Sequence, residues 1–264
     1  MVRGLYTTLI AALSLTLTLP FAAVADDDAM DLSGLKWRNI GPAFMSGRIA
    51  DIDWDPEDSS VWYVAVGSGG VWKTENAGVS WTPIFDAQSS YSIGNVTVDP
   101  SNPNTVWVGT GEDVGGRHVG FGDGIYRSDD GGATWENMGL EESQHISTIL
   151  VHPSNSDVVW AAVQGPLWTP GGERGLYKTS DGGKTWRNVL SAGEWTGVTD
   201  IVLDPSNPDV LYAATWQHHR TVAAYMGGGP ESGVHKSTDG GETWQRLETG
   251  LPKGNMGKIG LTIS

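Results

Sequence analysis

Apolar and polar residues alternate in short runs along residues 37–264, and Gly, Pro, Asp and Ser interrupt these runs at close intervals. Alternation with a period of two predicts half-buried β-strands, and the interrupting residues predict tight turns. No segment after residue 26 shows the longer period of an amphipathic helix. The pattern therefore predicts an all-β fold.

A repeat organises these strands. Each repeat has a proline turn, at Pro56, Pro100, Pro153 or Pro205, and a later segment that ends in tryptophan. Those four segments, which we call the turn motifs, align without gaps: KTENAGVSW (73–81), RSDDGGATW (127–135), KTSDGGKTW (178–186) and KSTDGGETW (236–244). The repeat length is about 50 residues, which is typical of propellers and solenoids.

Each repeat predicts four strands. Strand A is apolar and ends at the proline turn, in residues 48–54, 93–98, 146–151 and 198–203. Strand B carries one aromatic residue per repeat: Tyr63, Trp107, Trp160 and Tyr212. Strand C leads into the turn motif, in residues 70–74, 124–128, 175–179 and 233–237, and strand D begins at the motif's tryptophan. Four short strands per repeat predict one propeller blade each.

The turn motif resembles the Asp-box, or bacterial neuraminidase repeat, with the pattern Ser/Thr-x-Asp-x-Gly-x-Thr-Trp. Three copies match it, whereas the first has Asn76 and Ser80 in place of the Asp and Thr. Together with WRNIGP (37–42) and SGGVWKT (68–74), the chain resembles the sortilin-N, or VPS10-like, bacterial propellers that are often labelled glycosyl hydrolases. The resemblance implies a β-propeller of four-stranded antiparallel blades.

The Asp residues of the turn motifs have two possible roles, one structural and one catalytic. An Asp in such a turn accepts hydrogen bonds from nearby backbone N–H groups, and a large Trp anchors the returning strand. One catalytic centre does not need a copy in every blade. We therefore interpret the motif residues as structural: Asn76, Trp81, Asp130, Trp135, Asp181, Trp186, Asp239 and Trp244.

The repeats differ in length mainly between strands B and C, where units 2, 3 and 4 carry insertions. In a four-stranded meander these B–C loops share one face with the D–A connections, opposite the turn motifs. Insertions on one face often form a binding surface, although surface drift is the alternative. The basic and imidazole candidates for ligand binding are Arg48, Arg117, His118, Arg174, His218, His219 and Arg220.

Three chemistries fit these loops. Glycoside hydrolysis needs two carboxylates, and the candidates are Glu112, Asp113 and Glu173. The chain is similar to xyloglucanases in strands B and C of the first blade, but Ser68 stands where those enzymes have an Asp before Gly-Gly. Sialidases of the Asp-box family have an Arg-Ile-Pro motif in the first blade, and the nearest segment here, Gly47-Arg48-Ile49-Ala50, lacks the Pro. The second chemistry is binding of a glycan, peptide or protein.

The third chemistry is metal binding. His118 with His218-His219 is one conceivable zinc set, but a solvated loop is the favoured interpretation, so no metal site is predicted. Calcium held by loop carboxylates stays open, and no other cofactor is implied. Cys is absent, which excludes disulfides and thiolate sites. The 264-residue chain has a net charge of −15, which disfavours nucleic acid as a partner.

The first and last residues of the chain give two further predictions, about export and about the number of blades. Arg3, the apolar run to Leu19 and Ala23-Val24-Ala25 predict a signal peptide over residues 1–25, cleaved after Ala25, and hence a secreted or periplasmic protein without membrane insertion. An acidic linker over 26–36 precedes the propeller at 37–264. Residues 257–261 repeat 47–51, which predicts four blades plus the first strand of a fifth, in an incomplete propeller; four-bladed closure is the alternative.

The sequence therefore predicts an exported propeller that binds a glycan or a peptide through its B–C loops. The alternative is a glycoside hydrolase, sialidase-like or another exo-glycosidase, whose site further blades complete.

Overall fold

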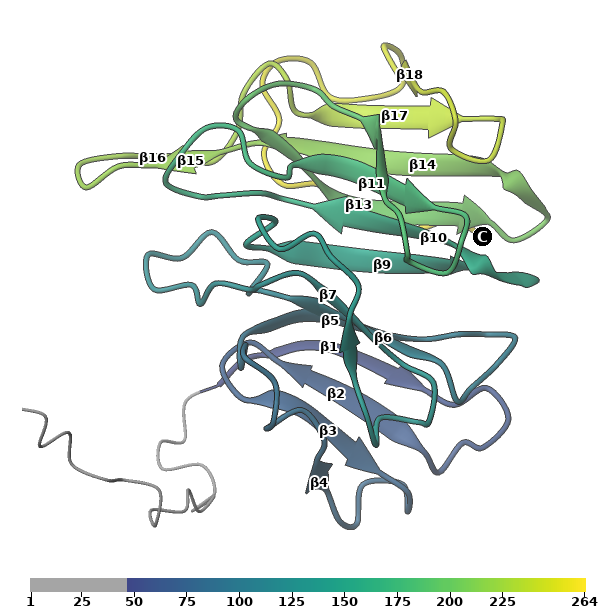
Figure 1. The fold of residues 1–264 in the computed structure, drawn as a ribbon. Helices are drawn as coiled ribbons and strands as arrows, with labels where there is room; N and C mark the ends of the chain where they lie inside the picture. Colours follow the sequence, from purple (N-terminus) through teal and green to yellow (C-terminus); the bar gives the residue numbers. More distant parts are fainter. Residues whose placement is uncertain (1–46) are drawn as a thin grey trace, which may run out of the picture. The chain divides into compact units, whose positions relative to one another are not determined.

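The computed structural model describes residues 47–264, and their strands form four four-stranded antiparallel sheets in chain order (Figure 1). We call these sheets blades 1 to 4. Blade 1 contains β1 (Ile49–Trp54), β2 (Trp62–Val66), β3 (Gly70–Thr74) and β4 (Thr82–Pro83). Blade 2 contains β5 (Ile93–Val98), β6 (Val106–Thr110), β7 (Ile125–Ser128) and β8 (Glu136–Asn137).

Blades 3 and 4 repeat this order with longer strands near the proline turns. Blade 3 contains β9 (Ile146–His152), β10 (Asn155–Val163), β11 (Gly175–Thr179) and β12 (Arg187–Leu190). Blade 4 contains β13 (Thr196–Asp204), β14 (Asn207–Gln217), β17 (Gly233–Ser237) and β18 (Gln245–Arg246). A separate hairpin, β15 (His219–Arg220) with β16 (Tyr225–Met226), extends from the connection between β14 and β17.

The predicted all-β fold of four-stranded blades is confirmed. Strands A, B and C lie where the alternation predicts them, and strand D begins one residue after each motif tryptophan. The β15–β16 hairpin was not predicted, because it lies inside an insertion without alternation. Within residues 47–264, no element is a helix long and apolar enough to cross a membrane.

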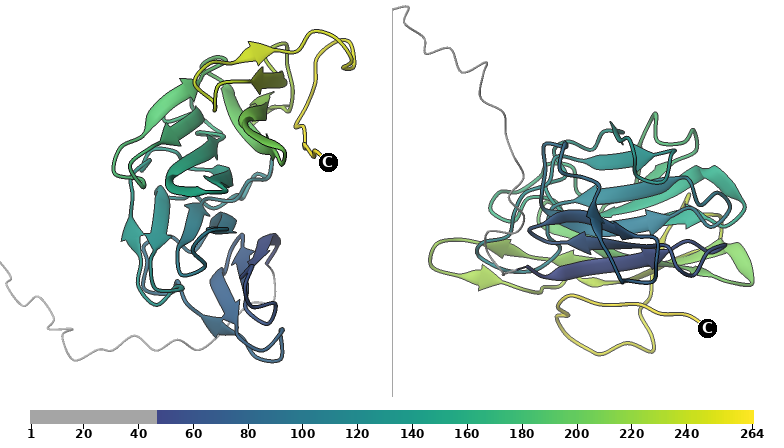
Figure 2. Two further views of the ribbon diagram at one scale, coloured as in Figure 1. Left: turned by 90° about the vertical axis from the view of Figure 1, so that its right-hand side faces the viewer. Right: turned by 90° about the horizontal axis from the view of Figure 1, so that it is seen from below.

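Neighbouring blades pack face to face along their innermost strands, with β1 against β5, β5 against β9 and β9 against β13 (Figure 2). Side chains also join these strands: Asp53 Oδ2 accepts a hydrogen bond from Val98 N at 2.7 Å. Apolar clusters fill each interface, and Trp107 and Trp160 are almost completely buried in two of them. The blades follow one another as in a β-propeller.

The turn motifs connect each blade to its neighbour. Trp135 Nε1 donates to Ile84 O of blade 1, and Trp186 Nε1 donates to Met138 O of blade 2, both at 2.9 Å. In the other direction, Arg127 Nη1 donates to Gly182 O of blade 3 at 2.9 Å. In blades 2 and 3 the motif tryptophan therefore bonds to the preceding blade, a partner that the sequence did not identify. In blade 4, Trp244 Nε1 instead donates to Gly241 O of its own motif at 3.2 Å.

Gly183 shows why the motif needs glycine at its sixth position. Its φ of 93° lies in the left-handed region, which glycine adopts without steric cost. A Cβ there would also lie 2.7 Å from Cη2 of Trp107 in blade 2. The residue thus allows both the turn and the close approach of the two blades.

The motif carboxylates accept hydrogen bonds within their own turns. Asp181 Oδ1 accepts from Thr185 N at 2.9 Å and from Thr179 Oγ1 at 2.7 Å, and Oδ2 accepts from Thr185 Oγ1 at 2.6 Å. These hydrogen bonds lower the pKa of Asp181 from 3.8 to about 2, with the Thr185 hydroxyl as the largest cause. Asn76 accepts from Ser80 N in the same way in blade 1.

We expect Asp181→Ala to lower the free energy of unfolding, because the turn loses its acceptors. Folding lowers the pKa of Asp181, so its ionised carboxylate stabilises the folded state. This stabilisation is complete above about pH 4 and is lost as the pH falls through about 2. Asp181→Asn keeps a side-chain oxygen that can accept the turn hydrogen bonds, as Asn76 does in blade 1. This variant should therefore lose the acid dependence of stability but keep the stability at neutral pH. Urea denaturation between pH 2 and pH 7 measures both variants; equal acid dependence in wild type and Asp181→Asn would contradict the assignment.

The final residues of the chain lie beside blade 4. Leu261 N donates to Asp200 Oδ2 at 2.7 Å, and Thr199 Oγ1 donates to Ile259 O at 3.5 Å. The first contact matches the one between Val96 N and Asp51 Oδ2 in blades 1 and 2. Residues 257–261 are not a strand here, so their role as the start of a fifth blade stays a prediction. The predicted signal peptide, acidic linker and WRNIGP segment lie outside the described residues.

Candidate functional site

The insertions of blades 2, 3 and 4 form the candidate site. They are the B–C loops of residues 111–124, 164–174 and 218–232, which lie at the left of Figure 1, whereas the turn motifs lie at the right. We call the surface made by these three loops the loop face. The motif carboxylates are therefore on the opposite side of the blades from the loop residues.

Hydrogen bonds join the three loops. Arg220 Nη2 donates to Gly115 O at 2.9 Å, and Arg117 Nη2 donates to Val222 O at 3.0 Å, which connects blades 2 and 4. Arg220 N donates to Leu167 O at 3.0 Å, which adds the loop of blade 3. Arg117 and Arg220, predicted as ligand-binding residues, thus lie in one continuous surface.

Aromatic side chains are exposed on this surface. Phe121, Trp168 and Tyr225 have exposed fractions of 59%, 37% and 39%, one in each loop. The guanidinium of Arg220 lies 4.3 Å from the centre of the Tyr225 ring, which holds both groups in place. The loop face therefore combines flat apolar rings with cationic hydrogen-bond donors.

Arg174 has a different role from the one expected of it. It is buried, with 5% of its surface exposed, and it donates to four backbone carbonyls of its own loop. The acceptors are Gln164 O, Pro166 O, Thr169 O and Gly171 O. Burial lowers the pKa of this guanidinium to about 10. Arg174 holds the loop of blade 3 closed, and this contact set leaves it unavailable to a ligand.

The histidines that composed the conceivable zinc set lie in separate surroundings. His218 is buried and stacks on Trp216 with ring centres 4.1 Å apart, and burial lowers its pKa to about 4. His219 packs on Trp195 at 4.4 Å, and His118 is exposed. Within residues 47–264 no three histidine or acidic side chains gather at metal-ligand spacing.

Two of the three carboxylates that were candidates for catalysis pair with basic side chains of this chain. Glu112 is buried and accepts hydrogen bonds from Arg48 and from Ser68 Oγ, the latter at 3.0 Å. Asp113 Oδ2 pairs with Lys258 Nζ at 2.9 Å. The structure therefore brings Arg48 and Glu112 together. It also shows that Ser68 bonds to Glu112 and that Lys258 pairs with Asp113, two contacts that the sequence spacing did not predict.

Glu173 is the third carboxylate of the candidate set. Its Oε2 accepts a hydrogen bond from Glu142 N at 2.8 Å, and burial is the main cause that raises its pKa. No ion pair holds Glu173 among the described residues, which sets it apart from Glu112 and Asp113.

The four blades define a β-propeller fold, and insertions between its strands form the loop face. The comparisons with known proteins agree on the fold. The family model described as Sortilin, neurotensin receptor 3 (Sortilin-Vps10) matches residues 123–257, just over half of the chain. The chain belongs to the Sortilin-Vps10 family.

Xyloglucanases and GH74 enzymes are among the proteins to which the chain is similar. A xyloglucanase from Acetivibrio thermocellus is 25% identical over 92% of this chain and 30% of its own length. The structure of a GH74 enzyme from Niastella koreensis is 25% identical, with a TM-score of 0.55 over 74% of this chain and 28% of that one. An ancestral GH74 enzyme, 24% identical with a TM-score of 0.58 over 78% of this chain and 25% of that one, shares the fold.

The chain spans about a third or less of the length of the curated xyloglucanases that it matches. A probable oligoxyloglucan-reducing end-specific xyloglucanase from Neosartorya fischeri is 25% identical over 76% of this chain but only 24% of its own length. The comparisons therefore show the fold and the relationship to xyloglucanases.

Proposed function

We propose that this chain binds carbohydrate through the loop face. The observation that carries the proposal is the joining of three loops into one surface that presents Trp168 and Tyr225 beside Arg220. Sugar rings have an apolar C–H face that packs on aromatic rings, and their hydroxyls accept hydrogen bonds from guanidinium groups. The relationship to proteins named as xyloglucanases supports a glycan over a peptide ligand.

The test is calorimetric titration of xyloglucan-derived oligosaccharides and of cello-oligosaccharides into the purified chain. We expect Trp168→Ala and Tyr225→Ala each to weaken binding about 10-fold, because each removes a stacking platform worth about 1.4 kcal/mol. Trp54→Ala is the matched control. Trp54 is 58% exposed, and it is the last residue of β1, at the end of the strand that points away from the loop face. Binding that persists unchanged in both variants, or no binding at all, would reject the proposal; binding of a peptide alone would favour the other ligand class.

Glycoside hydrolysis is the second candidate function, and the xyloglucanase relationship favours it. The contacts within this chain do not complete a catalytic pair, because Glu112 and Asp113 both have cationic partners. Ser68 also occupies the position that precedes Gly69-Gly70 and donates to Glu112. If the protein hydrolyses glycans, Glu173 is the candidate for the general acid. It lies in the loop of blade 3, and burial raises its pKa, as a general acid requires. Release of reducing ends from xyloglucan, lost in Glu173→Gln, would establish this function.

We also propose that the protein is exported, on the basis of residues 1–25. The mature chain is expected to begin at Asp26. Mass analysis of the N-terminus of protein recovered outside the cytoplasm measures this directly. A retained Met1 in membrane-bound material would show that the apolar run is an anchor instead.

A further inference from the structure

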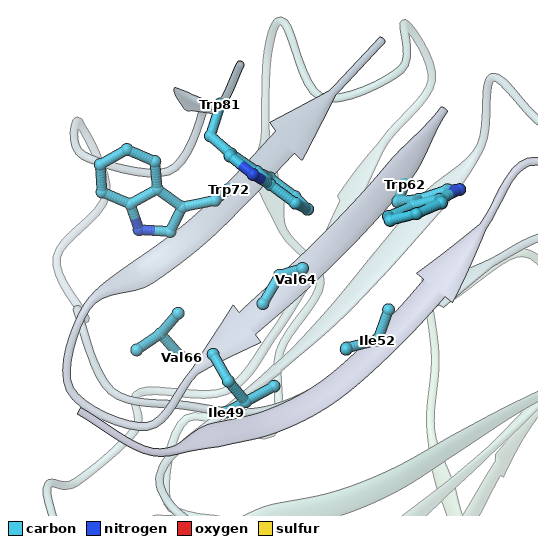
Figure 3. Close-up of a pocket in the computed structure, with 7 residues that line it drawn as sticks. All are labelled: Ile49, Ile52, Trp62, Val64, Val66, Trp72 and Trp81. Carbon is cyan, nitrogen blue, oxygen red and sulfur yellow. The ribbon is translucent and has the colours of Figure 1, made fainter. Parts of the chain in front are cut away.

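An apolar hollow and a polar turn both leave side chains without partners in the described part of the chain. The hollow lies on blade 1 and has a volume of about 370 Å³; its lining includes Ile52, Trp62, Val64 and Trp81 (Figure 3). Aliphatic and indole side chains of this kind suit another apolar surface. The turn comprises residues 143–145, directly before β9, and its unpartnered side chains are polar, so it is the place that points to a polar ligand.

This turn contains three buried polar atoms without partners. His145 is 2% exposed, and neither its Nδ1 nor its Nε2 has a hydrogen-bond partner among residues 47–264. Ser143 is completely buried, and its Oγ has no partner within the same residues. Buried polar side chains in proteins are nearly always hydrogen-bonded, because an unpaired group loses its hydration without compensation. Three such atoms in one turn therefore indicate a binding partner from outside this part of the chain.

The equivalent side chains of blades 1 and 2 do have partners. Arg48, Ser92 and His145 each come directly before the innermost strand of their blade, β1, β5 and β9. Arg48 donates to the carboxylate of Glu112, and Ser92 Oγ donates to two backbone carbonyls at 3.0 Å. The unpaired ring of His145 is therefore a particular feature of blade 3 and not a part of how the repeat is built.

The three atoms can both donate and accept hydrogen bonds. Burial is the main cause that lowers the pKa of His145 to about 4, although the backbone of Glu112 and the carboxylate of Asp113 oppose it. The ring is thus neutral at pH 7, with one N–H and one free lone pair, and a serine hydroxyl has the same dual character. An anion only accepts hydrogen bonds and would leave the second ring nitrogen unpaired. Ligand hydroxyls, which donate and accept, complement all three atoms.

Phe121, in the loop of blade 2, covers the ring of His145. The ring centres are 6.1 Å apart with the planes at 64°, and Phe121 is 59% exposed. Its backbone is held, since Phe121 O accepts from Ser90 Oγ at 3.3 Å. The turn is joined to the same loop, because Gln144 O accepts from Gly122 N at 2.8 Å. Rotation of one exposed side chain therefore uncovers His145 toward the loop face.

We propose that Phe121 is a gate, and that a sugar unit of the ligand displaces it and hydrogen-bonds through its hydroxyls to His145 and Ser143. This inference rests on the proposed binding of carbohydrate by the loop face. Trp168 and Tyr225 bind the apolar faces of sugar rings, whereas this inner subsite recognises hydroxyl positions. The ligand class is therefore a neutral oligosaccharide with free hydroxyls on the unit that reaches His145.

The thermal midpoint of the free chain gives the first test. His145→Leu replaces an unpaired imidazole with an apolar side chain of similar size, so we expect the midpoint to rise by about 3 °C. Ser92→Ala is the matched control at the equivalent position, and it should lower the midpoint by about 3 °C because it removes formed hydrogen bonds. If His145→Leu lowers the midpoint as well, the ring already has a partner in the free protein, such as a bound water, and the proposal is wrong.

Calorimetric titration with xyloglucan-derived oligosaccharides gives the second test. We expect His145→Leu to weaken binding about 10-fold and Ser143→Ala about 5-fold. In protein with labelled histidine, the imidazole nitrogen signals of His145 should shift when the oligosaccharide binds. If Trp168→Ala weakens binding and His145→Leu does not, the outer rings alone bind the ligand; this inference is then wrong and the proposed function stands. If no oligosaccharide binds, both are wrong.

Phe121→Ala tests the gate. Diethyl pyrocarbonate modifies accessible neutral imidazoles, and peptide mass analysis locates the modified residue. We expect His145 to be modified at least 10-fold faster in Phe121→Ala than in the wild type, since the variant lacks the covering ring. His118 is exposed and should react equally in both proteins. Equal protection of His145 in the two proteins would show that Phe121 does not control access, and would overturn the proposed gate.

Discussion

Arg174→Ala is expected to lower the free energy of unfolding by about 4 kcal/mol. The substitution leaves buried carbonyls of the blade 3 loop without donors, and each unpaired buried acceptor costs about 1–3 kcal/mol. Because the four acceptors belong to one loop, the costs should not add fully. Urea denaturation followed by circular dichroism gives the value.

Two further variants separate this structural role from ligand contact. Arg174→Lys should recover less than half of the loss, since an ammonium cannot reproduce a planar guanidinium that reaches four carbonyls. Arg220→Ala, which loses one carbonyl contact and the Tyr225 stacking, should cost about 1 kcal/mol of stability but weaken glycan binding about 10-fold. If Arg174→Ala unfolds like the wild type and binds no glycan, Arg174 contacts the ligand after all.

Trp186→Ala is expected to cost about 3 kcal/mol. The half-buried indole loses its edge-on contact with Trp107 and its hydrogen bond to Met138 O, both of which join blade 3 to blade 2. The same urea series measures this variant. The transition should also broaden, because weaker coupling lets the blades unfold separately.

Trp81→Ala provides the matched control for Trp186. Trp81 occupies the same motif position but packs on Trp62 of its own blade and is 38% exposed. Its removal should cost about 1 kcal/mol, since no described neighbouring blade depends on it. Equal losses for the two variants would show that the motif tryptophan stabilises its own hairpin and does not join blades.

The blades could be predicted from the sequence because their determinants are local. Alternation within a strand, the proline turn and the Asp of the turn motif act within a few residues of one another. Asp181, for example, bonds Thr179 and Thr185. The repetition of each signal in four units removed the ambiguity that a single short strand would leave.

The partners across blades could not be predicted in the same way. Trp186 is visible in the sequence, but its acceptor Met138 lies in another repeat and outside any motif. Lys258 pairs with Asp113 across 145 positions, and only the arrangement of the blades brings them together. A linear pattern contains no signal for such contacts.

The sequence indicated which loops carry insertions, but it did not indicate the surroundings of each side chain in them. Length variation located the loops, because insertions accumulate where the blade core is not disturbed. It could not separate Arg220, which lies on the surface, from Arg174, which turns inward to four carbonyls. That difference arises from the path of the Gly-rich loop, where Gly165 and Gly171 adopt positive φ.

Hydrogen exchange of the purified chain, with and without saturating xyloglucan-derived oligosaccharide, tests carbohydrate binding by the loop face most directly. We expect slower exchange in residues 111–124, 164–174 and 218–232, and unchanged exchange in the turn motifs on the opposite side. Protection confined to the turn motifs, or no protection in any of the three loops, would contradict it.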